Sequence, residues 1–317
     1  MKKGAIITAI VLLTAGLLIF VGGLFAGGSL PPMTYEAMRY SVNEPFADIH
    51  IDTHEMNIEF ILSEDGTCSV DSAVTEKFYP NVTVRDGVLT VTTVDERTWV
   101  ARLMMSADQP MQIRLPGTAY RTLSVESHTG DVTVDSRFSF DNVQITASTG
   151  DVTCGASAEN AIEITASTGD ITLENVKAEE LWLVVSTGRI AVKGAEIQKG
   201  VLLTVSTGKL EIDGLSCESL TSTGSTGRVT LRNLDVEHAL WIERSTGDVN
   251  FENVGAETIT VHTETGDVTG TLRSAFYFVT ETNTGKVRVP DTHSGGRCEI
   301  TTSTGDIRIE PADAQNP

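Results

Sequence analysis

Apolar and polar residues alternate through most of the chain, around a Thr-Gly dipeptide that recurs every 19–20 residues. Apolar residues occupy the positions six and four before each threonine, and three and five after it. In the second copy these residues are Val143, Ile145, Val152 and Cys154, and in the seventh they are Leu240, Ile242, Val249 and Phe251. A period of two is typical of β-strands with one buried face. Each repeat therefore predicts a strand, a turn at Ser-Thr-Gly, a second strand and a corner.

The dipeptide recurs in ten copies, at Thr129, Thr149, Thr168, Thr187, Thr207, Thr226, Thr246, Thr265, Thr284 and Thr304. One repeat has too little apolar surface to fold alone, so we expect neighbouring repeats to stack as coils and bury a continuous core. A propeller blade needs about 40–45 residues, twice this period. The sequence therefore predicts an all-β protein, a β-solenoid of about ten coils, with the threonines in a ladder along one edge.

Turn residues support this interpretation. The glycine of each Thr-Gly supplies the positive φ that a tight turn needs, and Asn or Gly serves the far corner. A further apolar residue follows at that corner, and we expect it to be buried: Val176, Leu215, Leu234 and Val254.

Two departures from the regular repeat are informative. The sixth has polar Ser222 in a core column and a second Thr-Gly at Gly224, so we expect its coil to be the weakest of the stack. The last copy ends with Ile307-Arg-Ile-Glu-Pro311. Its Arg308, Glu310 and Pro311 are expected to protect the open edge from pairing with another molecule.

Residues 34–122 show shorter and less regular strand patterns, at Ala47–Phe60, Val82–Thr93 and Met111–Leu115. Asp86-Gly87 between two alternating runs predicts a hairpin turn. We interpret residues 34–122 as an irregular β start and N-terminal cap, 123–310 as the regular solenoid, and 311–317 as a tail. Residues 99–105 break the alternation, and we expect them to form a short helix or loop that covers the first coil.

The N-terminal segment predicts a membrane anchor. Residues 4–30 carry no charge and follow Lys2 and Lys3, and about 20 apolar residues suffice to cross a bilayer. The alternative is a cleaved signal peptide, whose apolar region is usually about 7–15 residues long, with a weak cleavage site before Ser29. The two lysines place the N-terminus in the cytoplasm. Residues 1–33 are thus expected to form a signal anchor, a single transmembrane helix in the cell membrane, with the C-terminal domain outside the cytoplasm.

Charge and cysteine content exclude several classes. The chain has 23 Lys and Arg against 43 Asp and Glu, a net charge of -20, which argues against nucleic-acid binding. Four cysteines are too few for a disulfide scaffold of this length. We expect all four to be buried free thiols: Cys68, Cys154, Cys217 and Cys298.

The residue after each Thr-Gly forms a charged column. It reads Asp131, Asp151, Asp170, Arg189, Lys209, Arg228, Asp248, Asp267, Lys286 and Asp306. Three successive aspartates at the strand spacing of about 4.8 Å suit a hard cation such as Ca²⁺. They also resemble the paired carboxylates of polysaccharide-cleaving enzymes, while the plainer interpretation is a solvated turn position. Likewise, the three basic residues are either a site for an anionic ligand or a balance of charge between neighbouring coils.

Sites of other kinds are not indicated. His50 and His54 lie four residues apart, but in an alternating strand pattern, so they do not share a helical face. The sequence contains no His-Glu-x-x-His motif, no phosphate-binding loop and no Cys-x-x-Cys pair. We therefore predict no catalytic residue, no resident metal and no cofactor.

The N-terminal span, the irregular strands, the Ile113-Arg-Leu-Pro116 strand and the Ser-Thr-Gly-Asp-Val units resemble the bacterial putative adhesin family of β-strand-repeat proteins, a domain of unknown function, over about residues 45–310. The resemblance implies a bacterial envelope protein with a β-solenoid ectodomain and no catalytic residues. We expect a membrane-anchored surface module that binds or scaffolds, with a wall glycan or another envelope protein as its partner. The alternatives are a partner protein in envelope sensing and a carbohydrate-active β-helix enzyme.

Overall fold

Stacked β-coils make up the computed structural model, which describes residues 16, 35–99 and 109–311. The chain divides into two units, residues 1–36 and 37–317, and the architecture below is that of the second. The expected membrane anchor, residues 1–33, lies outside the described residues apart from Gly16. In the part of the chain that the structure describes, no helix is both long enough and apolar enough to span a bilayer.

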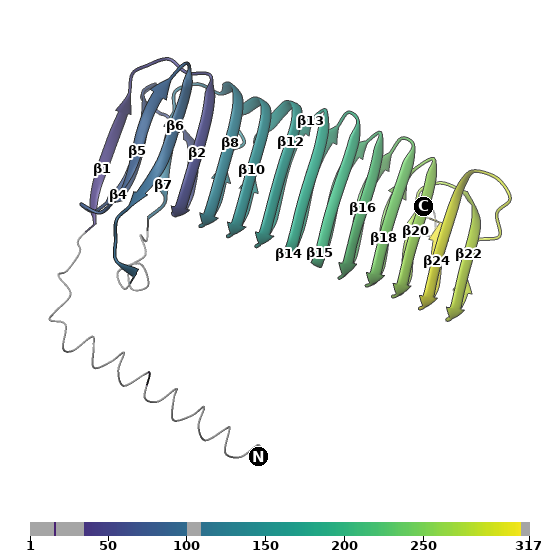
Figure 1. The fold of residues 1–317 in the computed structure, drawn as a ribbon. Helices are drawn as coiled ribbons and strands as arrows, with labels where there is room; N and C mark the ends of the chain where they lie inside the picture. Colours follow the sequence, from purple (N-terminus) through teal and green to yellow (C-terminus); the bar gives the residue numbers. More distant parts are fainter. Residues whose placement is uncertain (1–15, 17–34, 100–108, 312–317) are drawn as a thin grey trace. The chain divides into compact units, whose positions relative to one another are not determined.

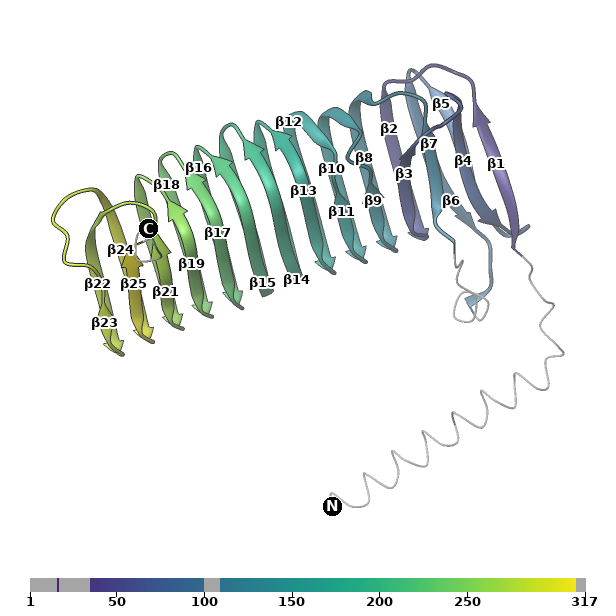
Figure 2. The same cartoon turned by 180° about the vertical axis from the view of Figure 1, so that it is seen from behind.

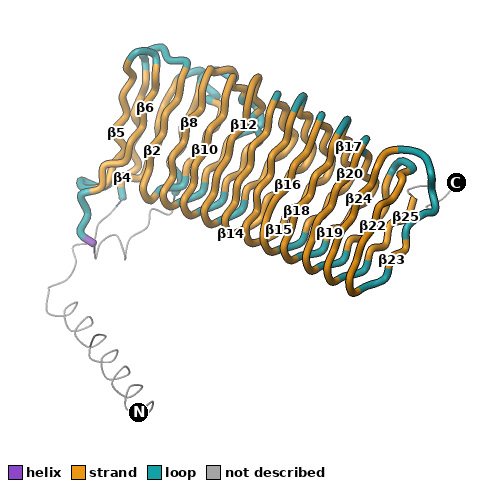
Figure 3. Tube along the Cα trace, turned by 45° about the vertical axis from the view of Figure 1, so that its right-hand side comes forward, coloured by secondary structure: helices purple, strands orange, loops and turns teal. Residues whose placement is uncertain are grey.

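Each regular coil contributes a strand before the Thr-Gly turn and a strand after it (Figure 1). The strands are β8 (Ala119–Thr129), β9 (Val132–Val134), β10 (Ser139–Thr149), β11 (Val152–Cys154), β12 (Ser157–Thr168), β13 (Ile171–Ala178), β14 (Glu180–Ile197), β15 (Gly200–Cys217), β16 (Ser219–Thr226), β17 (Val229–Val236), β18 (Ala239–Thr246), β19 (Val249–Gly255), β20 (Thr258–Thr265) and β21 (Val268–Leu272). In β14 and β15 the strand continues through the turn without a break. Figure 3 shows the coils stacked side by side with the turns along their edges.

Neighbouring coils pair in parallel, with equivalent repeat positions opposite one another. Thr149 pairs with Thr129 on one side and with Thr168 on the other. The same register holds Thr187, Thr207, Thr226, Thr246 and Thr265 in line. The predicted threonine ladder is therefore confirmed, and every outward position forms a similar column along the stack.

The core lies between the two strand layers, on the predicted positions. In the third copy Ile162, Ile164, Ile171 and Leu173 are all 0% exposed. The apolar corner residues are buried as well, among them Val176 and Leu215. The period-two pattern is thus confirmed, since alternate side chains of each strand point into the solenoid.

Glycine is required at the turn for two reasons. Gly208 has a φ of 141°, and a Cβ atom there would lie 1.6 Å from the carbonyl oxygen of Gly188 in the neighbouring coil. At the far corner, Asn175 and Asn233 adopt left-handed φ angles of 55° and 49°. Asn233 also donates a 2.9 Å hydrogen bond from Nδ2 to Asp213 Oδ1 one coil away, so this corner joins neighbouring coils through side chains.

At the N-terminal end, a coil formed by residues 48–62 lies between the first regular coil and strands that come later in the sequence than this coil. Strands β2 (Asp48–Glu55) and β3 (Ile58–Leu62) pair with β8 and β9 on one side. On the other side they pair with β6 (Val88–Asp95) and β7 (Met111–Leu115). The predicted hairpin is confirmed, because β5 (Phe78–Arg85) pairs antiparallel with β6 through Asp86-Gly87.

Two further strands complete this end. Strand β4 (Cys68–Val74) pairs antiparallel with β7, and β1 (Glu36–Val42) pairs with β4. Antiparallel pairing therefore replaces the parallel stacking here. Of the segment expected to cover the first coil, only Trp99 is described, and the remainder lies outside the described residues.

At the C-terminal end, the last two repeats exchange places. Strands β24 (Gly296–Thr304) and β25 (Ile307–Pro311) lie between the β20–β21 coil and the coil of β22 (Phe276–Thr284) and β23 (Val287–Arg288) (Figures 1 and 2). The prediction that the last copy forms the open edge is therefore wrong. The physical reason is burial: the last copy places Cys298, Ile300, Ile307 and Ile309 in its core columns. The outer copy has Thr280 in a core column and leaves Val287 44% exposed.

Candidate binding face

The acidic column serves the backbone of the coil that follows. Asp131 Oδ1 accepts a 2.8 Å hydrogen bond from the backbone N–H of Asp151, and Asp151 Oδ1 accepts an equal one from Asp170. Asp170 Oδ1 in turn accepts from the backbone N–H of Arg189 at 2.9 Å. A short carboxylate thus satisfies a backbone donor at each of these three turns, which explains the three aspartates without a cation or a reaction.

The basic part of the same column is paired with neighbouring acids. Arg189 lies 3.1 Å from Asp170 and 3.5 Å from Glu211, and Arg228 lies 3.3 Å from Asp248. These pairs join successive coils. They support charge balance for both arginines rather than a site for an anionic ligand.

An unexpected apolar column lies on the outward surface of β14, β15, β16 and β18. Trp182, Leu202 and Trp241 occupy the position five before the turn threonine, and they are 42%, 40% and 44% exposed. The register aligns Trp182 with Leu202, Leu202 with Thr221, and Thr221 with Trp241. Because successive residues of a strand point to opposite sides, the alternation that buries Leu183 and Leu203 must expose these side chains.

The adjacent outward column adds hydroxyl groups. Val184, Thr204 and Thr223 lie in register beside the apolar column. The hydroxyl groups of Thr204 and Thr223 are 3.2 Å apart, within hydrogen-bonding distance. We call these seven residues the tryptophan face: Trp182, Val184, Leu202, Thr204, Thr221, Thr223 and Trp241. Three coil steps separate its two tryptophans, about 14 Å at the spacing of neighbouring strands.

Sequence reasoning overlooked this face, although a signal was present. Outward positions of the same column elsewhere carry polar residues, apart from Val279 in the outer coil: Ser124, Gln144, Glu163, Thr260 and Glu299. Tryptophan is highly buried on average in proteins, so two tryptophans at positions that the alternation assigns to solvent mark a departure from the structural rule.

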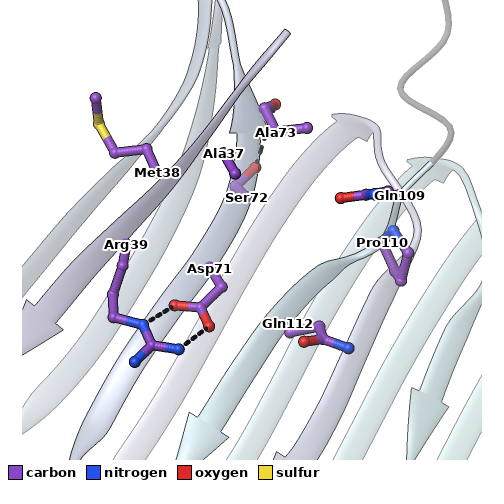
Figure 4. Close-up of a pocket in the computed structure, with 9 residues that line it drawn as sticks. All are labelled: Ala37, Met38, Arg39, Asp71, Ser72, Ala73, Gln109, Pro110 and Gln112. Atoms are coloured by element: carbon purple, nitrogen blue, oxygen red, sulfur yellow. Dashed lines mark hydrogen bonds and ion pairs between the residues drawn. The ribbon is translucent and has the colours of Figure 1, made fainter.

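A hollow of about 500 Å³ lies at the N-terminal end, lined by residues of β1, β4 and β7 and by Gln109 and Pro110 (Figure 4). Its single lining carboxylate, Asp71, accepts two 2.8 Å hydrogen bonds from Arg39. Arg114 Nε donates to the same carboxylate at 2.9 Å. Partial burial alone would raise the pKa of Asp71, but these bonds and the positive charges outweigh it and hold the pKa below its usual value. The hollow therefore contains a carboxylate that is paired with two arginines, rather than an acid–base pair.

The four cysteines are free and buried, as expected. Burial raises the pKa of Cys68 to about 11 and that of Cys154, Cys217 and Cys298 to about 12. Thiols with such pKa values are unreactive core residues at neutral pH.

The coil geometry and the tryptophan face define a repeat scaffold that presents a flat, partly aromatic surface. The chain belongs to the Toastrack DUF4097 family, which matches residues 46–232 and 199–316. This confirms the resemblance inferred from the Ser-Thr-Gly units.

A solved structure shares the fold of this chain. A putative adhesin from Parabacteroides distasonis is 13% identical, with a TM-score of 0.51, over 87% of this chain and 98% of that chain. A putative adhesin from Parabacteroides merdae is 12% identical, with a TM-score of 0.49, over 87% of this chain and 96% of that one. No match is found among curated proteins.

Proposed function

We propose that the protein is a non-catalytic binding module of the bacterial envelope, which holds an extended, neutral glycan across the tryptophan face. The observation that carries the proposal is the exposure of Trp182 and Trp241 in one register-locked surface. Tryptophan offers a large, rigid apolar area with a polar N–H at its edge. Such residues dominate the binding energy where they are desolvated at the centre of an interface.

The surroundings favour a neutral and repetitive ligand. Thr204, Thr221 and Thr223 place hydroxyl groups between the two tryptophans, where they can exchange hydrogen bonds with sugar hydroxyls. The net charge of -20 repels anionic polymers. The solved putative adhesin from Parabacteroides distasonis, which shares this fold, is consistent with a binding role.

The location of the module is part of the proposal. Lys2, Lys3 and the uncharged residues 4–30 support a membrane anchor with the solenoid outside the cytoplasm. Protease added to cells stripped of their outer layers should then digest the solenoid. Recovery of a soluble mature protein that starts near Ser29 would contradict the anchor.

Retention of the full-length protein, purified in detergent, on insoluble wall glycan and on neutral polysaccharides tests the binding function. Trp182→Ala and Trp241→Ala should each weaken retention by about 30-fold, as expected for a central residue worth about 2 kcal/mol. Trp99→Ala is the matched control, because Trp99 is 68% exposed but lies outside the tryptophan face. Unchanged retention of the double variant, or release of cleaved sugars by the wild type, would refute the proposal.

A protein partner in envelope sensing is the second candidate, and the open edge of the solenoid favours it. Within the described residues β22 pairs on one side only, with β24, and its Tyr277 and Val279 are exposed. An unpaired strand edge can accept a strand of another chain. If this candidate holds, Val279→Lys should abolish pull-down of the partner while glycan retention stays unchanged.

A further inference from the structure

Two histidines lie side by side on the outward surface near the N-terminal end of the stack. Strands β2 and β8 pair in register, with Thr53 opposite Ser127 and Glu55 opposite Thr129, so that His54 lies opposite His128. Their rings stack with centroids 4.6 Å apart and an interplanar angle of 5°. The fold thus brings together two side chains that are far apart in the sequence.

Coil formation does not explain these histidines. His128 immediately precedes the turn threonine, and His54 occupies the equivalent position in the β2 coil. Seven other copies have serine at this position: Ser148, Ser167, Ser186, Ser206, Ser225, Ser245 and Ser303. The histidines occur only in two adjacent coils, where they can act together.

A carboxylate completes the group. Asp52 lies two residues before His54, on the same outward side of β2, and its Oδ1 is buried without a hydrogen-bond partner. A buried carboxylate oxygen that lacks a donor is costly, and a bound cation would satisfy it. Among the described residues, Asp52, His54 and His128 form the one group of three or more potential metal ligands whose donor atoms all lie within 4.8 Å of one another.

The backbone fixes the proton on one ring. His128 Nδ1 lies 3.3 Å from the carbonyl oxygen of Thr53. A carbonyl oxygen can only accept, so Nδ1 carries the hydrogen and Nε2 keeps its lone pair. A hydrogen bond from the second ring nitrogen to a backbone carbonyl is the usual way in which proteins orient a metal-binding histidine.

We propose that Asp52, His54 and His128 bind a transition-metal ion, with Zn²⁺ as the best fit. Two imidazole nitrogens and one carboxylate oxygen are ligands that Zn²⁺ accepts at about 2.0–2.2 Å, with a fourth position open to water. Donor atoms around one tetrahedral ion lie about 3.4 Å apart at those bond lengths. The donor atoms already lie within 4.8 Å of one another, and we expect side-chain rotation of the exposed histidines to bring them to that separation.

The ion would join the β2 coil to the β8 coil. Because the three ligands converge only in the folded chain, binding would stabilise the stack at its N-terminal end. This role is independent of the tryptophan face, which lies on β14 to β18.

A calorimetric titration with Zn²⁺ tests the site. It uses the metal-free, full-length protein in detergent. We expect one equivalent to bind and to raise the melting temperature measured by circular dichroism. His54→Gln, His128→Gln and Asp52→Asn should each weaken binding at least about tenfold and remove the thermal shift. Co²⁺ should give the absorption spectrum of a tetrahedral nitrogen- and oxygen-ligated ion.

His262→Gln is the matched control, because His262 is exposed on β20, away from the other histidines. It should leave affinity and thermal shift unchanged. The proposal is overturned if no saturable binding occurs, or if the His54 and His128 variants, folded by circular dichroism, bind Zn²⁺ as the wild type does. Equal weakening by His262→Gln would also overturn it.

Discussion

Replacing the buried pair of Ser222 and Arg244 by apolar residues is expected to stabilise the protein. Arg244 is 2% exposed and occupies an inward column, opposite Gly224 of the preceding coil. Its guanidinium donates to the carbonyl oxygen of Glu243 at 2.8 Å and to Ser222 Oγ at 2.9 Å. Neither of these partners is charged, so the positive charge is buried against neutral acceptors.

The magnitude follows from the cost of removing this charge from water. Burial lowers the pKa of Arg244 to about 10. The difference from an ordinary guanidinium corresponds to about 3 kcal/mol of unfavourable free energy in the folded state. The penalty is fully present at pH 7 and declines only as the pH rises through about 10, because the group then loses its proton in the folded state. Mutation at neutral pH is therefore the practical test.

A double-mutant cycle separates the contributions. Ser222→Ala alone should destabilise by about 1–2 kcal/mol, because a buried guanidinium loses one of its acceptors. Arg244→Met fills similar space without charge but leaves the Ser222 hydroxyl without its donor, so we expect a small net change. The combined variant removes both problems and should be more stable than wild type by about 2 kcal/mol.

Urea unfolding followed by far-UV circular dichroism provides the free energies, and equal m-values would show that the same surface unfolds in all four proteins. If the double variant is less stable than wild type by more than about 1 kcal/mol, the guanidinium contributes net stability and the desolvation argument fails. That the Ser222 coil is the weakest of the stack stays a prediction, because global unfolding does not resolve the stability of single coils.

Three further outcomes test the coil geometry. Ile164→Asp should cost several kcal/mol because it buries a charge without a partner, whereas Thr165→Asp should cost less than about 1 kcal/mol, and equal losses in urea unfolding would contradict the alternation. Gly208→Ala should prevent folding or cost more than about 4 kcal/mol, while Gly66→Ala, at a positive φ of 72° with open space around it, should cost about 1 kcal/mol. Cys298 and the other thiols should resist a maleimide in the native protein and react in urea, so labelling of the folded protein would contradict their burial.

The regular part of the fold could be predicted from the sequence because the apolar alternation, the turn residues and the corner residues all indicate the same structure. Inward positions such as Ile164 and Leu173, the turn glycines and the corner asparagines all indicate the same coil. A period of 19–20 residues then leaves stacking as the way to bury the apolar columns. The function of the Asp151 carboxylate as a backbone acceptor was not predicted, because it depends on the offset between coils rather than on any residue pattern.

The ends of the stack show why the remainder could not be predicted. A repeat pattern identifies coils but does not state their order in space. The chain doubles back between β22 and β24, so that the copy with Cys298 and Ile300 is covered on both sides. At the other end, β2 pairs directly with β8, although the β5–β6 hairpin lies between them in the sequence. Both arrangements follow from burial, which becomes visible only when three-dimensional neighbours are known.

The candidate sites lie at outward positions of the coil, which coil formation does not specify. Inward columns and turn residues specify the fold, so an outward side chain is free to vary at little cost to stability. Most outward positions carry polar residues that a solvated β-surface accepts. Trp182 and Trp241 are exceptions, and so are the stacked His54 and His128. Neither pair is needed to form a coil, and the register brings each onto one surface. These two observations are the reason why we propose a binding role for both.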